Sequence, residues 1–359
     1  MIRQAVLVAG MAAMLATAGN GREEPMAMSF LAPREWAAYL DAFVREDGRV
    51  VDTANGGISH SESQGYGLLL AVLAQDRAAF ERIWSFTRTE LMIRDDGLAA
   101  WRWEPEASPH VTDINNASDG DILIAYALAL AGNAWGDARK LEQATAIART
   151  VGQSMLVAAA DLTVILPGAE GFSAQARPDG PIVNPSYWIY EAFPVLAELT
   201  PEIDWMDVHA DGLALLERLL ADGRPPADWV ALGGAAPAPA AGFAPEFGYN
   251  NVRVPLYLVR ARLDDTALLE AIGMVFDADF APGRIDVASG ERLETMGEAG
   301  YRAIGAARAC VVDGAPFPAE LQYFEPASYY GSTLHLLALA HLRQWQNGCL
   351  AAGLAAAEG

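Results

Sequence analysis

The sequence predicts a mainly α-helical protein whose helices pair into hairpins. From Pro33 onward, apolar residues recur mostly at helical spacing, and the alternation typical of strands is scarce. Short polar connectors such as Asp76 and Gly136-Asp137 separate several of these segments, as expected between antiparallel helices. The chain has 359 residues, of which 52% are hydrophobic, so it has ample material for a large core.

Twelve segments carry the helical pattern, and twelve helices can close as six hairpins. Ser, Asn and Asp, which are preferred N-cap residues, stand before several of them. In chain order, the expected helices cover residues 34–46, 62–74, 77–93, 119–132, 138–158, 187–199, 206–221, 252–263, 266–276, 297–309, 318–324 and 328–346.

The breaks between the expected helices are of two alternating kinds. One kind is the plain polar turn, and the other is a longer loop that gathers Gly, Asn, Ser and aromatic residues just before a helix. Capping accounts for one residue in each long loop but not for the clustered Tyr and paired Asn. If the hairpins form a closed ring, these loops meet at one rim and build a common cleft. They are residues 56–61, 115–118, 184–187, 247–251 and 328–331.

The N-terminus predicts export. Arg3 precedes an apolar run at 5–15 and then Ala16-Thr17-Ala18, which is the order of a secretory signal peptide. The run is too short for a membrane span, so we expect cleavage after Ala18 and a periplasmic or secreted protein without a membrane span. We assign 1–18 to the signal peptide, 19–347 to one domain and 348–359 to a frayed tail. The Gly-, Pro- and Ala-rich stretch 233–244 is interpreted as a surface loop of that domain.

Charge and cysteine content narrow the function. The net charge of −22 disfavours nucleic acid and anionic lipid as partners and is compatible with a neutral polymer. The histidines include no HExxH motif, and we expect neither a metal nor a cofactor. Cys310 and Cys349 permit one disulfide or two buried thiols, and the sequence does not choose between these.

Two motifs place carboxylates at the beginning of apolar helices. Glu62 lies in Ser-Glu-Ser-Gln-Gly-Tyr-Gly, where partial burial against Tyr66 and the following leucines would raise its pKa, as a proton donor requires. The alternative is a first-turn acid that complements the helix dipole. Asp119 and Asp121 lie in Ala-Ser-Asp-Gly-Asp, two residues apart, so one can face a cleft while the other caps the helix.

The second motif, continued through Ile124-Ala125 and Trp135, resembles the signature of glycoside hydrolase family 8. The resemblance extends over nearly the whole chain after the signal peptide. The Glu62 motif is similar to the family's acid motif, Ala-Trp-Arg-Trp at 100–103 to its cleft tryptophans, and Asn-Pro-Ser-Tyr at 184–187 to its subsite tyrosine. Residues 283–290 and 328–330 most resemble the periplasmic members that accompany bacterial cellulose synthase.

The resemblance implies an (α/α)6 barrel and inverting hydrolysis, in which one carboxylic acid protonates the leaving oxygen and a carboxylate opposite it activates water. It implies Glu62 as the acid and Asp119 as the carboxylate that holds and distorts the sugar at the cleavage point. For substrate binding it implies the residues Trp101, Tyr187, Tyr249 and Arg253. Each aromatic among them could instead belong to the core.

The sequence departs from the family at the general base. The usual base is the Asp of a Tyr-Asp-x-x-Arg stretch, and this chain has Asn250 between Tyr249 and Asn251. A carboxamide has no basic site comparable to a carboxylate, so Asn250 is not expected to be the base. Some members of the family are similar in having Asn here and draw the base from another loop, and Glu246 and Asp113 are both candidates that the sequence does not rank.

We therefore expect an inverting endo-β-1,4-glucanase that hydrolyses cellulose-like chains in connection with bacterial cellulose synthesis. Its expected partners are a β-1,4-glucan chain and, through the closer resemblance, the cellulose synthase export machinery. One alternative is a glucan-binding protein with little hydrolysis, because of Asn250. Another is a chitosanase or xylanase on the same fold.

Overall fold

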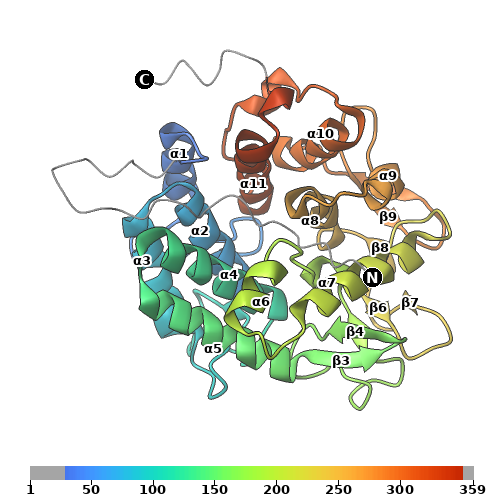
Figure 1. The fold of residues 1–359 in the computed structure, drawn as a ribbon, viewed down its shortest axis with the longest axis horizontal. Coiled ribbons are helices and arrows are strands. Elements are labelled where there is room, and N and C mark those ends of the chain that lie inside the picture. Colours follow the sequence, from blue (N-terminus) through green and yellow to red (C-terminus); the bar gives the residue numbers. More distant parts are fainter. Residues whose placement is uncertain (1–28, 351–359) are drawn as a thin grey trace, which may run out of the picture.

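The computed structural model describes residues 29–350. The expected signal peptide and residues 351–359 lie outside this range. Figure 1 shows a largely helical molecule with small sheets at its margin. The α-helices are α1 (Pro33–Phe43), α2 (Ser61–Leu73), α3 (Arg77–Phe86), α4 (Ser118–Trp135), α5 (Ala138–Ser154), α6 (Phe193–Leu199), α7 (Trp205–Leu220), α8 (Val254–Ala261), α9 (Ala267–Ile272), α10 (Ala299–Asp313) and α11 (Tyr329–Trp345).

Helical segments occupy part or all of each of the twelve expected spans. Eleven of the spans contain an α-helix, and the twelfth, at 318–324, contains only the 3₁₀ turn η5 (Ala319–Gln322). A π-helical turn, η1 (Thr87–Leu91), extends α3 to nearly the expected end of its span. Short 3₁₀ turns also occur at η2 (Pro185–Tyr187), η3 (Asn251–Arg253), η4 (Gly273–Val275) and η6 (Asn347–Cys349).

The expected helices at 138–158 and 187–199 are longer than the α-helices in the structure. The span 138–158 ends as helix at Ser154, because Leu156–Ala159 (β3) pairs with Leu162–Ile165 (β4) in a hairpin. Its turn residues Ala160 and Asp161 both have positive φ, as a tight hairpin turn requires. The span 187–199 becomes α-helix only at Phe193, one residue before Pro194, because proline is tolerated in a helix only within the first turn.

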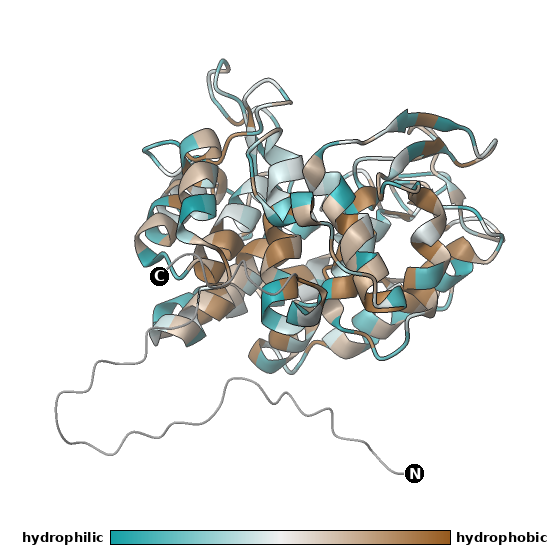
Figure 2. Ribbon diagram, turned by 90° about the horizontal axis from the view of Figure 1, so that it is seen from above, coloured by the Kyte–Doolittle hydropathy of each residue, from teal (hydrophilic) through white to brown (hydrophobic). Residues whose placement is uncertain are grey.

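Inner and outer helices alternate along the chain. The helices α2, α4, α8 and α11 are buried on nearly all sides, whereas α1, α3, α5 and α7 bury one face and expose the other. The inner elements contact one another in the order α2, α4, η2, η3 with α8, α10 and α11, which returns to α2. This closed ring of inner elements with outer partners is an (α/α)6 barrel, as predicted. In Figure 2 apolar residues, in brown, are concentrated toward the middle of the molecule, and hydrophilic ones, in teal, are frequent at its margin.

The inner elements all begin at the same rim. The long loops expected before helices lead into α2, α4, η2, α8 and α11, and the loop after β10 leads into α10. The side chains nearest these beginnings, Glu62, Asp119, Tyr187, Arg253, Glu298 and Tyr330, line one cleft. The predicted convergence of the elaborated loops is therefore present in the structure.

Small antiparallel sheets support these loops. β1 (Ser59–His60) pairs with β2 (Arg102–Trp103) next to Glu62. β5 (Ile182–Val183), β6 (Val230–Ala231) and β7 (Ala238–Pro239) form a second sheet, so that the Gly- and Pro-rich stretch contributes a strand. β8 (Glu246–Phe247), β9 (Gly283–Asp286) and β10 (Arg292–Thr295) form a third beside Asn250.

Distant parts of the chain are joined by two partly buried ion pairs and a disulfide. Arg343 on α11 donates to both carboxylate oxygens of Glu35 on α1, at 2.6 and 2.7 Å. Arg260 on α8 does the same to Glu191, at 2.6 and 2.8 Å. Cys310 and Cys349 form a disulfide, so the expected frayed tail does not begin at residue 348. None of the helices within residues 29–350 is long and apolar enough to cross a membrane.

Candidate active site

Glu62 is the second residue of α2, and the loop before it is held rigidly. His60 caps the helix, with its Nδ1 accepting from the Ser63 backbone N at 3.0 Å, while Ser63 Oγ accepts from the His60 backbone N at 3.0 Å. The other ring nitrogen of His60 faces Asp52 at 3.5 Å. The capping reciprocity fixes the direction in which α2 begins, so Glu62 projects into the cleft.

Asp119 is the second residue of α4, and two glycines let α4 approach α2 closely. A Cβ on Gly120 would lie 2.8 Å from the backbone N of Glu62 and 2.6 Å from Ser61 Cβ. A Cβ on Gly65 would lie 2.5 Å from Leu123 Cβ. Since no side chain fits at either position, the glycines of the two motifs bring the two carboxylates together.

Arg253 connects the two carboxylates. Its Nη2 donates to Asp119 Oδ2 at 2.6 Å and to Ser186 Oγ at 3.0 Å, and its Nη1 donates to Glu62 Oε2. The side chains of Arg253 and Asp119 are 1% and 2% exposed, and that of Glu62 is 16% exposed. Glu62 is thus the member of the trio that solvent or substrate reaches most easily.

Burial and Arg253 act against each other on these carboxyls. Burial raises the pKa of Asp119 to about 6, although the Arg253 guanidinium opposes this. Burial also favours the neutral form of Glu62, but Arg253 and then His60 bring the pKa of Glu62 below its ordinary value. The raised pKa expected for Glu62 itself is therefore not found in the free cleft, where Asp119 is the carboxyl that keeps its proton to higher pH.

The hollow around this trio measures about 690 Å³. Its lining combines four carboxylates, from Asp52, Glu62, Asp119 and Glu298, with a wall of aromatic rings. Aromatic faces suit the apolar faces of sugar rings, and carboxylates suit hydroxyl groups. The aromatic lining residues are Trp101, Tyr187, Trp229, Tyr249, Tyr301, Tyr329 and Tyr330.

The sequence-predicted binding residues lie at different depths in this cleft. The indole N–H of Trp101 donates to Asp113 Oδ2 at 2.8 Å, and Arg102 lies over its ring at 4.6 Å from the centroid. Tyr187 is buried next to Arg253, whose guanidinium carbon lies 5.7 Å from the ring centroid. Tyr249 is 44% exposed at the rim.

Of the residues in the predicted base region, Asn250 lines the cleft, whereas Glu246 and Asp113 are not among the lining residues. Glu246 accepts from Arg284 Nη1 at 2.8 Å on the β8–β9 side. Asp113 is exposed and bonded to Trp101. Neither Glu246 nor Asp113 faces the trio of Glu62, Asp119 and Arg253.

Several residues in the cleft or directly behind it were not singled out from the sequence. Trp229 comes directly before β6 and stacks with both Phe172 and Phe243, with centroids 5.6 and 4.7 Å away. Glu298 caps α10 and accepts from Ser328 Oγ at 2.6 Å. Asp228 lies buried behind Asn250. The only sequence signal that could have indicated one of these residues is the occurrence of Trp229 in a Pro-rich stretch. No sequence signal pointed to Glu298 or Asp228.

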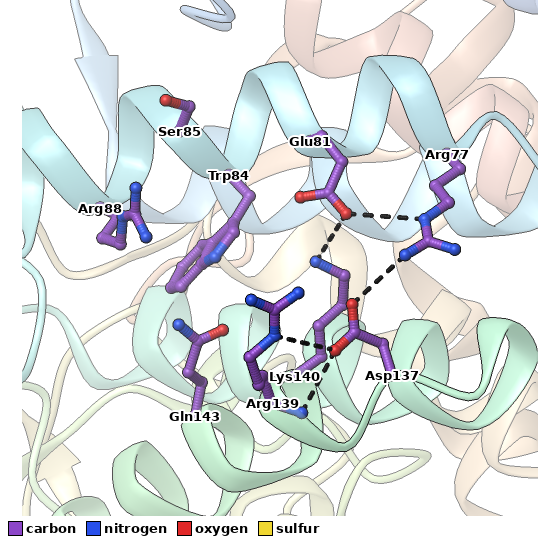
Figure 3. A pocket seen from close by; sticks show the side chains of 9 residues that line it. All are labelled: Arg77, Glu81, Trp84, Ser85, Arg88, Asp137, Arg139, Lys140 and Gln143. Carbon is purple, nitrogen blue, oxygen red and sulfur yellow. Dashed lines mark hydrogen bonds and ion pairs between the residues drawn. The ribbon is translucent and has the colours of Figure 1, made fainter.

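A second hollow, of about 400 Å³, lies on the outer helices α3 and α5. Figure 3 shows both acids of this hollow paired with basic residues: Glu81 with Lys140 at 2.8 Å, and Asp137 with Arg77 at 3.3 Å. It contains none of the residues of the trio, and its acids are neutralised, so we place the reactive site in the larger cleft. Within residues 29–350, no group of three His, Cys, Asp or Glu residues is arranged to hold a metal ion.

Comparison with known proteins finds relatives of this chain in sequence and in fold. A probable endoglucanase of Novacetimonas hansenii is 37% identical over 311 residues, covering 85% of this chain and 89% of its own. The solved structure of the endoglucanase Cel10 from Klebsiella pneumoniae, a family 8 glycosyl hydrolase, superposes with a TM-score of 0.77 at 34% identity, covering 87% of this chain and 99% of that one.

A further solved structure, the endo-β-1,4-glucanase CMCax from Acetobacter xylinum, gives a TM-score of 0.75 at 35% identity, covering 86% of this chain and 96% of that one. The sequence profile of the glycosyl hydrolases family 8 matches residues 4–344. With its barrel and its carboxylate-containing cleft, this chain belongs to the glycosyl hydrolases of family 8.

Proposed function

We propose that this chain is an inverting endo-β-1,4-glucanase that hydrolyses cellulose-like chains, with Glu62 as its proton donor. The observation that carries the proposal is the trio of Glu62, Asp119 and Arg253 on the floor of an aromatic-lined cleft. Relatives similar to this chain in sequence and in structure are endoglucanases, which supports a β-1,4-glucan as the substrate.

In the proposed reaction, Asp119 holds the sugar at the cleavage point and Glu62 protonates the leaving oxygen. Glu62 must carry a proton when it acts, whereas in the free cleft Asp119 holds the proton more tightly. The two carboxyls are close enough to hydrogen-bond when one is protonated. A sugar that displaces Arg253 from Glu62 would remove the charge that keeps Glu62 ionised and so favour proton transfer to it.

The test is Glu62→Gln, assayed by release of reducing ends from carboxymethyl cellulose. We expect a loss of about 10² to 10⁴ in kcat with little change in affinity for cello-oligosaccharides, because the amide keeps the size of the side chain but donates no acid proton. Glu81→Gln, the same change in the hollow of Figure 3, is the matched control and should leave kcat unchanged.

Two further readouts test the finer parts of the proposal. A fall in viscosity that precedes the release of reducing ends would support internal cleavage. The first product observed by proton NMR should carry the α-anomeric configuration, since inversion changes the β linkage. Turnover of Glu62→Gln within tenfold of the wild type, or a β-anomeric first product, would contradict the assigned chemistry.

Asn250 favours a second candidate, a glucan-binding protein with little hydrolysis, because no carboxylate stands at that position. Such a protein would bind cello-oligosaccharides without cleaving them. A panel of carboxymethyl cellulose, chitosan and xylan separates the proposed substrate from the two alternatives on the same fold.

We also propose that the protein is exported by the segment 1–18 and acts in the periplasm or outside the cell, in connection with cellulose synthesis. The order of charged, apolar and small residues in that segment supports export. A mature protein whose first residue is Gly19 is the expected result of N-terminal sequencing. Copurification with a cellulose export complex tests the partner.

A further inference from the structure

The structure contains a buried carboxylate directly behind Asn250. Asp228 Oδ2 accepts from the side-chain Nδ2 of Asn250 at 3.2 Å and from its backbone N at 3.2 Å. Asp228 Oδ1 accepts from the backbone N of Gly248 at 2.9 Å and of Asn251 at 3.0 Å. Asp228 is 6% exposed and does not line the cleft, so it contacts a bound sugar only through Asn250.

This arrangement determines which way the Asn250 amide points. The opposite orientation would place the amide oxygen against a carboxylate, which is repulsive, so the NH₂ group belongs on Asp228. The amide oxygen Oδ1 of Asn250 then points away from Asp228, and Asn250 lines the cleft. No donor within residues 29–350 is bonded to that oxygen, so it is free to accept a hydrogen bond from a water molecule.

The position of this pair in the barrel suits a water-activating group. In the ring of inner elements, α8 is the third element from α2 in either direction, so the beginning of α8 lies across the barrel from Glu62. The other cleft carboxylates are placed differently. Asp52 lies next to His60, which caps the helix that carries Glu62. Glu298, just before α10, accepts a hydrogen bond from Ser328, just before α11.

Building on the proposed inverting hydrolysis, we propose that Asn250 and Asp228 together take the proton of the attacking water, with Asn250 as the catalytic residue and Asp228 acting through it. As the water oxygen bonds to the anomeric carbon, its proton goes to Asn250 Oδ1, and the Nδ2 proton goes to Asp228 Oδ2. The glycosidic bond breaks, and the leaving oxygen takes the proton of Glu62.

After the step, Asn250 is a neutral imidic acid, Asp228 a neutral carboxylic acid and Glu62 a carboxylate. The cleft returns to its starting state when Asp228 gives its proton back to Nδ2, Oδ1 loses a proton to bulk water and Glu62 regains one. Burial raises the pKa of Asp228 above its ordinary value despite four hydrogen bonds that oppose this, which makes its carboxylate a better proton acceptor.

The experiment is a charge swap between the two residues, assayed on carboxymethyl cellulose. Asp228→Asn removes the acceptor and should lower kcat by about 10² or more while KM stays within about threefold. Asn250→Asp combined with Asp228→Asn places a carboxylate directly against the water and keeps a hydrogen bond between the two side chains. The double variant should recover most of the lost rate.

The pH profile distinguishes proton transfer from loop support. In the wild type, the acidic limb of kcat/KM should follow the raised pKa of Asp228, because a base acts only when deprotonated. In the double variant the limb should move to lower pH, because residue 250 is more exposed than Asp228. Asp76→Asn is the matched control, since Asp76 also holds backbone and side-chain donors, at the beginning of α3 and away from the cleft.

The possible outcomes separate this proposal from the proposed function. A wild type that cleaves glucan and an Asp228→Asn variant within threefold of it would overturn the relay and leave the hydrolase assignment intact. If the double variant is as inactive as Asp228→Asn, although circular dichroism shows that it is folded, Asp228 only holds the loop in place and takes no part in proton transfer. A wild type that cleaves nothing, while Asn250→Asp alone does, would overturn both proposals.

Discussion

Gly120 lies against the beginning of α2 so closely that a Cβ at this position would be 2.8 Å from the backbone N of Glu62. It would also be 2.6 Å from Ser61 Cβ, and neither this Cβ nor the backbone can rotate away as the end of a flexible side chain can. The separation of α2 and α4, and with it the separation of Glu62 and Asp119, therefore depends on the absence of a side chain here.

We expect Gly120→Ala to destabilise the protein by about 1–3 kcal/mol through overpacking and to lower kcat at least tenfold by moving Glu62 relative to Asp119. Denaturant unfolding and steady-state kinetics measure the two effects. Gly132→Ala is the control on the same helix, because its Cβ would meet the Leu141 side chain at 2.7 Å, far from the cleft. An equal loss of kcat in both variants would mean that stability alone explains the effect.

The burial of Asp121 is expected to make the free energy of unfolding depend on pH. It is 1% exposed and accepts from the Ala99 backbone N and from Asn116 Nδ2, both at 2.9 Å. Burial raises its pKa to about 7. Because the folded pKa lies above the unfolded one of about 4, the folded state binds the proton more tightly, and this stabilisation is lost as pH rises toward 7 and above.

Asp121→Asn should therefore flatten the pH dependence of the free energy of unfolding between pH 5 and pH 8. Relative to the wild type, the variant should gain about 2–4 kcal/mol on moving from pH 5 to pH 8, since the amide does not ionise. Urea unfolding of both proteins at the two pH values measures this difference. Parallel curves would show that Asp121 keeps an ordinary pKa.

Trp229 is expected to bind substrate. Its ring stacks with Phe172 and with Phe243 and lines the cleft near Tyr187. Trp229→Ala should raise KM for cello-oligosaccharides about threefold to tenfold with a smaller change in kcat, as expected for the loss of one aromatic contact. Trp345→Ala is the control, because Trp345 is an exposed Trp at the opposite end of α11. An unchanged KM for Trp229→Ala would leave Trp229 a core residue.

Much of the fold could be predicted because its signals are local. Helical spacing located the inner and outer helices, and the clustered Gly, Asn and Tyr located the loops that form the cleft rim. The errors have equally local causes. Leu156–Ala159 has no polar alternation to mark it as a strand, and Pro194 stands inside an apolar run that otherwise has helical spacing.

The site could be predicted only in part, since its key contacts join segments far apart in the chain. Glu62 and Asp119 stand in recognisable motifs, and Arg253 was expected to bind substrate. Its bridge between the two carboxylates spans 191 and 134 residues of sequence, which no local pattern encodes. Asp228 precedes Asn250 by 22 residues and resembles an ordinary loop acid until the fold places it behind the amide.

We expect loss of the disulfide to lower the stability of the protein but to leave catalysis nearly unchanged. Cys310 lies in the last turns of α10 and Cys349 just beyond α11, whereas both helices begin at the cleft with Glu298 and Tyr329. The bond therefore closes the ends of the two helices that point away from the site. It spans 39 residues, for which loop entropy in the unfolded chain amounts to about 4 kcal/mol.

Replacing both cysteines by Ser should lower the free energy of unfolding by up to about that amount, while kcat at 25 °C stays within twofold. Reducing the wild-type disulfide should have the same effect as the double substitution, which controls for the new side chains. A large loss of kcat under conditions where the variant remains folded would mean that the far ends of α10 and α11 determine the position of the cleft residues at their beginnings.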